Sequence, residues 1–176
     1  MSRWSDLVVS ISSLLQGEAP ASSGALLVLG APALAAALAE AGLGLQVAAV
    51  CSEAEAAKVS RRFPELALVT AEAGAVPLAP GSLDALVVVD GLGGAADPLE
   101  RVASWAALLR PGGALLLLER PPGSLWSGLR RLGGKARPPS PEALCATLLN
   151  LGLRRVGQLH PTGRPARRVT FGHRAA

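Results

Sequence analysis

Aromatic residues are scarce in this sequence. There is no Tyr, and only two Phe and three Trp occur among 176 residues, although half of the residues are hydrophobic. The core must therefore consist mainly of Leu, Val and Ala, which suits a parallel sheet covered by helices. A chain of this length fits one domain that buries roughly 70% of the surface exposed on unfolding. We therefore expect a single domain over residues 1–176 that needs no covalent cross-links to fold.

Cysteine is equally rare, and its spacing excludes several classes of site. Cys51 and Cys145 lie far apart and match no metal-ligand, redox or disulfide framework. We expect two buried thiols in a reducing compartment, and no metal site.

Targeting and membrane signals are also lacking. Residues 1–17 contain Asp6 and several serines, without the basic start and apolar run of a signal peptide. The longest apolar run elsewhere, around residues 113–118, is too short to cross a bilayer. The sequence therefore predicts a cytoplasmic protein with no transmembrane segment.

Acidic residues almost disappear from the last third of the chain. Up to Glu119 there are six basic and twelve acidic residues, whereas from Arg120 onward there are eleven basic residues and only Glu142 is acidic. Such asymmetry favours an anionic partner, for example a nucleic acid, bound through residues Arg120–Arg174. The alternative is that the Arg content reflects a GC-rich genome.

Hydrophobic patterns predict strands that alternate with helices, hence a Rossmann-like α/β fold. We expect a seven-stranded, mostly parallel sheet with helices on both faces and a C-terminal antiparallel hairpin. The N-terminal helix falls within residues 1–17, and a Pro/Gly/Arg-rich flap covers residues 121–139. The predicted strands are 25–29, 45–50, 66–70, 83–89, 114–118, 153–160 and 167–173; the predicted helices are 3–16, 33–41, 52–62, 98–109 and 141–151.

Two motifs in the middle of the chain resemble those of a known family. Residues 76–88 read VPLAPGSLDALVV, and residues 109–115 read LRPGGAL after the helix start Asp97-Pro98. Both resemble the class I S-adenosylmethionine-dependent methyltransferases of the small-molecule type, and the order of elements matches over nearly the whole chain. The resemblance implies S-adenosylmethionine as cofactor. Physically, Gly112 and Gly113 relieve a helix-to-strand turn, and Asp84 at a strand start is structural.

The glycine-rich cofactor loop of that family is altered here. Its Gly-x-Gly-x-Gly pattern corresponds to residues 30–34, so that Gly30 is kept while Pro32 and Leu34 replace the other glycines. The acidic residue that binds the ribose corresponds to Cys51, and a thiol cannot replace a carboxylate acceptor. Glu53 could replace it only if the loop were shifted by two residues.

The remaining candidates follow the third and fourth strands. By the resemblance, Glu72 matches the acidic residue that faces the adenine amino group. Asp90 points toward the same crevice at the carboxyl ends of the strands. It binds a substrate amine or caps the loop 91–94. No catalytic nucleophile or base stands out in the sequence. Methyl transfer does not require one, because positioning the acceptor can supply most of the rate. His160 and His173 are expected at the surface or in the hairpin.

Two functions from different classes remain open. The first is an S-adenosylmethionine-dependent methyltransferase with Gly30, Cys51, Glu72 and Asp90 at its cofactor site. Its acceptor is unknown and is either a small molecule or a polymer recognised through a basic surface. The second is an inactive scaffold that binds a protein or anionic partner through its Arg-rich part, where Trp126, Arg130, Arg131, Lys135 and Arg137 form a docking segment. A nucleotide-dependent oxidoreductase is disfavoured, because no Gly-x-Gly-x-x-Gly loop occurs.

Overall fold

A computed structural model describes residues 4–16, 24–72, 75–93, 95–120, 139–161 and 167–175. The flap and the docking segment predicted within residues 121–139 lie almost wholly outside the described residues. The helices are α1 (Ser5–Gln16), α2 (Pro32–Glu40), α3 (Glu53–Arg62), α4 (Pro98–Ala107) and α6 (Pro141–Asn150). The strands are β1 (Gly24–Leu29), β2 (Leu45–Cys51), β3 (Ala67–Thr70), β4 (Leu83–Val89), β5 (Leu109–Glu119), β6 (Leu153–Leu159) and β7 (Arg168–Arg174).

The strands form one sheet in the order β3-β2-β1-β4-β5-β7-β6. Strands β1 to β5 pair in parallel, and β7 pairs antiparallel with both β5 and β6. The predicted mostly parallel, Rossmann-like sheet with a closing hairpin is therefore confirmed. The chain order reverses between β1 and β4, and an open α/β sheet binds its ligands at such a switch point, beyond the carboxyl ends of the strands.

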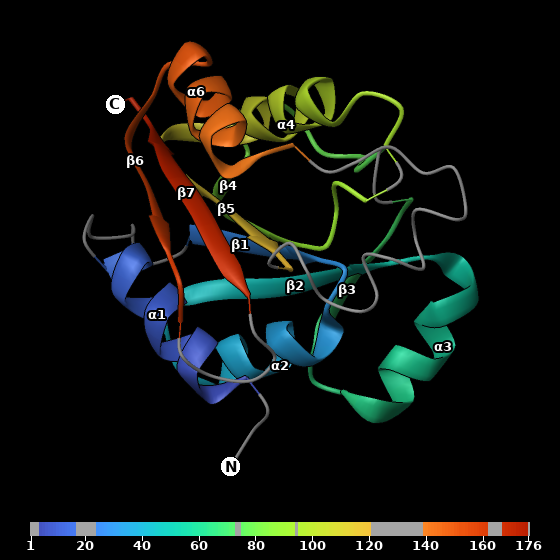
Figure 1. Ribbon diagram of the computed structural model, residues 1–176. Coiled ribbons are helices and arrows are strands. Elements are labelled where there is room, and N and C mark those ends of the chain that lie inside the picture. Colours follow the sequence, from blue (N-terminus) through green and yellow to red (C-terminus); the bar gives the residue numbers. More distant parts are fainter. Residues whose placement is uncertain are drawn as a thin grey trace.

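Helices cover both faces of the sheet (Figure 1). Helices α1 and α2 pack on one face through Ile11, Leu34 and Leu38, and α4 and α6 pack on the other through Trp105 and Leu148. Leu, Val and Ala make up most of both clusters, as the scarcity of aromatic residues predicted. Helix α3 differs, because it has no buried residue and lies beside the short edge strand β3.

The connection from α4 to β5 differs from the prediction. Asp97 caps α4, accepting from the amides of Leu99 and Glu100 at 2.9 and 3.0 Å, as expected. The helix ends at Ala107, however, and β5 already begins at Leu109, so the Pro-Gly-Gly segment lies inside the strand. Gly112 has a φ of +79°, a conformation that glycine adopts readily. The helix ends early because the Leu108 carbonyl accepts a hydrogen bond from the Leu83 amide. This bond joins the turn after α4 to β4.

The amino edge of the sheet is held by polar contacts. Asp84 accepts a hydrogen bond from the Ala25 amide at 2.7 Å and forms an ion pair with Arg110. Arg174 donates to the carbonyls of Ala107 and Leu109. Asp84 therefore joins β1, β4 and β5, which confirms its structural role.

The predicted burial was wrong for Cys145, whereas the two histidines lie at the surface and in the hairpin, as expected. Both cysteines are free, but only Cys51 is buried, because Cys145 lies on α6 beside the edge strand β6. His160 is exposed, whereas His173 is buried in β7, opposite Ala114. Its burial follows from the central position of β7 between β5 and β6.

Candidate functional site

The carboxyl edge of the sheet brings the predicted site residues into one row. The pairs Cys51–Thr70, Leu29–Val50 and Leu29–Val88 align the ends of β3, β2, β1 and β4. Glu72, Cys51, Gly30 and Asp90 therefore follow one another along this edge. Their binding roles remain predictions, but the topology places all four at the switch point.

Gly30 is required by the backbone where β1 ends. Its φ is +80°, and a Cβ atom added there would lie 2.4 Å from the Val89 carbonyl oxygen. Only glycine fits such a close approach of two strands in this conformation. The one glycine kept from the family pattern is therefore the one that the packing of β1 against β4 demands.

The two replaced glycines have different consequences. Pro32 occupies the first position of α2, where an amide would have no helical partner, and its ring therefore costs the helix nothing. Leu34 is fully buried in the core between α2 and the sheet, so its side chain does not occupy the carboxyl edge. The amides of Leu34 and Ala35 already bond to the Ala31 carbonyl. The first turn of α2 consequently offers few free donors to a ligand.

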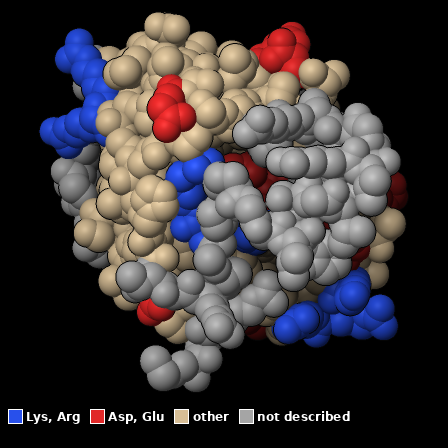
Figure 2. Space-filling model, in the orientation of Figure 1, with Lys and Arg blue, Asp and Glu red and all other residues tan. Residues whose placement is uncertain are grey.

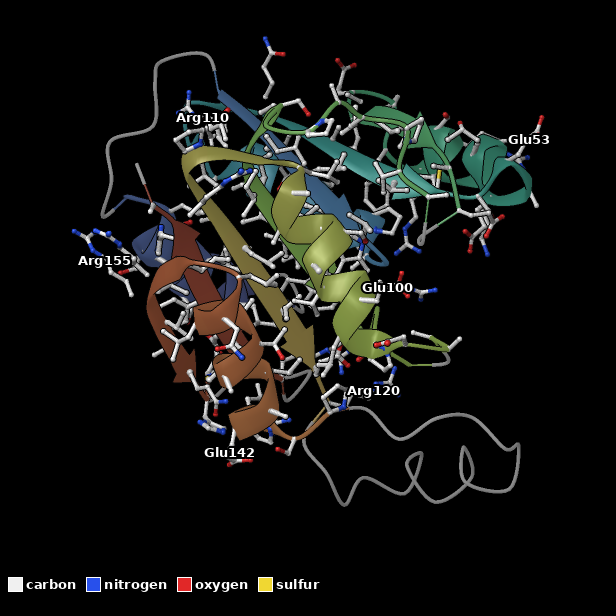
Figure 3. All side chains as sticks on the ribbon, turned by 90° about the horizontal axis from the view of Figure 1, so that it is seen from above. Glu53, Glu100, Arg110, Arg120, Glu142 and Arg155 are labelled. Carbon is white, nitrogen blue, oxygen red and sulfur yellow. The ribbon has the colours of Figure 1, made fainter. Side chains whose placement is uncertain are left out.

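Cys51 ends β2 with its side chain buried. The next residue, Ser52, caps α3 in a capping box: its amide and hydroxyl donate to Glu55 at 3.3 and 2.9 Å. Burial, and to a lesser extent the negative charge of Glu55, raise the pKa of the Cys51 thiol. The thiol is therefore neutral near pH 7 and a poor acceptor. Glu53 is exposed on the first turn of α3 (Figure 3).

This arrangement predicts the reactivity of Cys51. In a Cys145→Ser background, a disulfide-forming thiol reagent should modify Cys51 slowly, because the thiolate is disfavoured. Glu55→Gln should shift the pH midpoint of the reaction rate downward, since it removes a negative charge and keeps a side chain that can cap α3. Glu53→Gln is the matched control and should leave the midpoint unchanged. An unchanged midpoint in Glu55→Gln would refute the electrostatic explanation.

Glu72 lies beyond the end of β3 and is exposed. The Ala71 amide donates to the Cys51 carbonyl at 3.0 Å, which holds this segment beside the end of β2. The Glu72 carbonyl accepts from Ala75 at 2.9 Å in the following turn. The carboxylate thus stands at the solvent side of the edge, where it can accept hydrogen bonds from a ligand.

Asp90 is the most constrained residue of the edge. It has a φ of +53°, which few non-glycine residues adopt and which often marks a functional site. One carboxylate oxygen, Oδ2, accepts from Arg120 Nε at 3.1 Å and from Arg167 Nη2 at 2.9 Å. The Arg167 side chain is only 5% exposed, that of Arg120 41%. Asp90 thus joins β4 to the end of β5 and the start of β7.

Glu119 holds the loop after β4, a role that one of the two alternatives gave to Asp90. The Leu92 amide donates to the buried carboxylate of Glu119 at 3.3 Å, so Glu119 takes the loop-binding role proposed for Asp90. Glu119 lies directly opposite the buried Arg168 in the pairing of β5 with β7. Arg101 of α4 donates to the Gly91 carbonyl at 3.3 Å.

The sequence reasoning missed both arginines that contact Asp90. Arg120 follows the fifth strand just as Asp90 follows the fourth, so the rule that placed Asp90 at the edge also applies to Arg120. Arg167 precedes an antiparallel strand, and only the register of the hairpin brings it to the same edge. Near the centre of Figure 2, basic side chains are visible with acidic side chains set deeper beside them.

Other chemistries find no support in the described part of the chain. No cluster of three or more potential metal ligands occurs there. No helix in these ranges is long and apolar enough to span a membrane.

The sheet has this strand order with one antiparallel strand, a tight glycine turn follows β1, and an acidic residue follows β3. Together these features define the class of Rossmann-like methyltransferases. A family model described as "Methyltransferase domain" matches residues 28–117. The chain therefore belongs to this methyltransferase family. A search of curated proteins finds no match.

Solved structures share the fold at low identity. A methyltransferase from Thermotoga maritima, described as a possible histamine N-methyltransferase, is 19% identical with a TM-score of 0.62, covering 98% of this chain and 93% of that one. A putative methyltransferase from Haloferax volcanii, in complex with the activator Trm112, is 15% identical with a TM-score of 0.69 (98% and 92%). One from Bacillus halodurans is 14% identical with a TM-score of 0.67 (95% and 100%).

The described residues fit S-adenosylmethionine at two of three positions. Gly30 keeps the tight turn at the end of β1, and Glu72 supplies an exposed carboxylate after β3. The buried thiol of Cys51 does not supply the charged acceptor that the ribose hydroxyls require. Leu34 does not obstruct the edge, because it points into the core.

Proposed function

We propose that this protein is an S-adenosylmethionine-dependent methyltransferase that acts on a small-molecule acceptor. The observation that supports this most is the exposed carboxylate of Glu72, which follows β3 at the carboxyl edge in a chain whose residues 28–117 match the methyltransferase family. When bound, the cofactor would supply a methyl group carried on a sulfonium. Gly30 would keep the turn after β1 close to β4 beside the cofactor, and Glu72 would accept a hydrogen bond from its adenine amino group.

The remaining requirement of the reaction is positioning. Holding an acceptor in line with the methyl group can supply most of the rate without a catalytic acid or base. Asp90 and its arginines lie at the end of β4, next to Gly30, and would bind the acceptor.

Titration calorimetry with S-adenosylmethionine and S-adenosylhomocysteine tests this proposal. We expect micromolar binding, weakened about tenfold in Glu72→Ala, because a hydrogen bond to a charged group is lost. Glu65→Ala is the matched control: Glu65 is also exposed but precedes β3, at the opposite end of that strand. Weaker binding in Glu53→Ala would indicate that Glu53 replaces the ribose acceptor.

The second candidate is an inactive scaffold, and the buried neutral thiol of Cys51 favours it. The Haloferax volcanii relative in complex with an activator makes a protein partner a reasonable proposal for this chain as well. A nucleic-acid partner has less support, because Arg120, Arg167 and Arg174 bond within the protein. Absence of heat with both ligands at millimolar concentration would favour the scaffold, and a labelled-RNA polarisation titration would then test the anionic partner.

A further inference from the structure

We propose that the acceptor carries a carboxylate, which binds to Arg120 at the carboxyl end of β5. This inference rests on the proposed function, because the bound molecule is an acceptor only if the protein transfers methyl groups. It rests on the cluster formed by Asp90, Arg120 and Arg167, which neither the family match nor the known chemistry of methyl transfer requires.

The cluster carries more positive than negative charge. Two arginines share one carboxylate, and both bond to the same atom, Asp90 Oδ2. The pair Glu119 and Arg168, opposite each other on β5 and β7, adds no net charge. Arg101, bonded to the Gly91 carbonyl, adds a further positive charge nearby. The cluster therefore attracts an anion that approaches this edge. The attraction is stronger where the cluster is buried, because the dielectric constant is lower there.

Arg120 has the geometry to bind a carboxylate. Its Nε atom donates to Asp90, and within the described part of the chain its terminal Nη1 and Nη2 atoms have no hydrogen-bond partner. These two nitrogens form the planar fork that binds carboxylates through two parallel hydrogen bonds. The side chain is 41% exposed, and Asp90 fixes its orientation from behind. Arg167, only 5% exposed, cannot reach solvent and serves to hold Asp90 in place.

The cluster lies where an acceptor is expected. Gly30 separates two halves of the carboxyl edge: Cys51 and Glu72 follow β2 and β3 on one side, and Asp90 follows β4 on the other. Arg120 lies one strand further out, at the end of β5 near the start of α4 (Figure 3). A cofactor on the β2–β3 side would leave the β4–β5 side to the acceptor. A carboxylate held by Arg120 would anchor the acceptor, and another of its atoms would receive the methyl group.

An NMR titration tests this assignment. Isotope-labelled protein saturated with S-adenosylhomocysteine is titrated with benzoate, benzamide and phenyl phosphate as probes. We expect benzoate to bind with a lower dissociation constant than benzamide, because benzamide lacks the charge. Phenyl phosphate tests whether the site prefers a phosphate, which the same guanidinium fork can bind. Arg120→Gln should weaken benzoate at least about tenfold, and Arg120→Lys should recover only part of the affinity.

Arg110→Gln is the matched control. Arg110 is 38% exposed and pairs with Asp84, much as Arg120 pairs with Asp90, but it lies at the opposite end of β5 (Figure 3). Benzoate should bind this variant as it binds the unaltered protein. Any of four results would overturn the carboxylate site. These are binding of benzamide as tight as that of benzoate, tighter binding of phenyl phosphate than of benzoate, no binding of benzoate at all, and binding of benzoate to Arg120→Gln as tight as to the unaltered protein.

Failure of this inference is separable from failure of the proposed function. If S-adenosylhomocysteine binds but benzoate does not, the carboxylate site is wrong and the methyltransferase proposal stands. If benzoate binds through Arg120 in the absence of any cofactor binding, the anion site stands and the methyltransferase proposal fails. If Arg120→Gln weakens S-adenosylhomocysteine itself, the carboxylate recognised is that of the cofactor, and the acceptor assignment is overturned.

Discussion

Gly30→Ala is expected to lower the free energy of unfolding by about 3 kcal/mol or more. The φ of +80° strains any residue with a Cβ atom, and the new atom would lie 2.4 Å from the Val89 carbonyl oxygen. Relief requires β1 and β4 to move apart at the centre of the sheet. Urea denaturation followed by circular dichroism measures the change.

Gly44→Ala separates the two causes. Gly44 has a φ of +72°, but no atom lies within 4 Å of an added Cβ there. This variant should therefore show only the backbone strain, about 1–2 kcal/mol. Equal losses in the two variants would show that the approach of β1 to β4 is not tight, and the argument for a constrained cofactor edge would fail.

Asp90→Asn is expected to cost about 3–5 kcal/mol of unfolding free energy. The substitution keeps the shape of the side chain, and Asn tolerates a positive φ as well as Asp does. Its effect is therefore electrostatic: the guanidinium of Arg167, only 5% exposed, loses the charge of the Asp90 carboxylate while it remains buried. Urea denaturation at neutral pH measures this loss.

Two further variants identify the buried charge as the cause. Arg120→Gln should cost less than about 1 kcal/mol, because a pair with an exposed side chain contributes little to stability. The double variant Asp90→Asn/Arg167→Met should be more stable than Asp90→Asn alone, because it removes the buried charge that has lost the Asp90 carboxylate. A double variant that is no more stable would attribute the loss to packing rather than to charge.

Much of the fold could be predicted from the sequence, because its determinants are local. Short apolar runs alternate with helix formers, and Asp97-Pro98 and Ser140-Pro141 start helices at the positions observed. The end of α4 was misplaced, because Pro111 and Gly112 are typical of a helix stop, whereas in the structure they lie within β5. There the bond from Leu83 to the Leu108 carbonyl, a contact distant in sequence, decides where the helix ends.

The candidate site was predictable only where a position follows from strand order. The sequence by itself determined that Gly30, Cys51, Glu72 and Asp90 meet at one edge, since parallel strands bring their carboxyl ends together. Tertiary structure alone decided that Leu34 turns into the core and that the charge of Glu55 helps to raise the pKa of the buried Cys51 thiol. It also decided that Asp90 pairs with Arg120 and Arg167, because a contact across 77 residues depends on the register of the final hairpin, which no local pattern encodes.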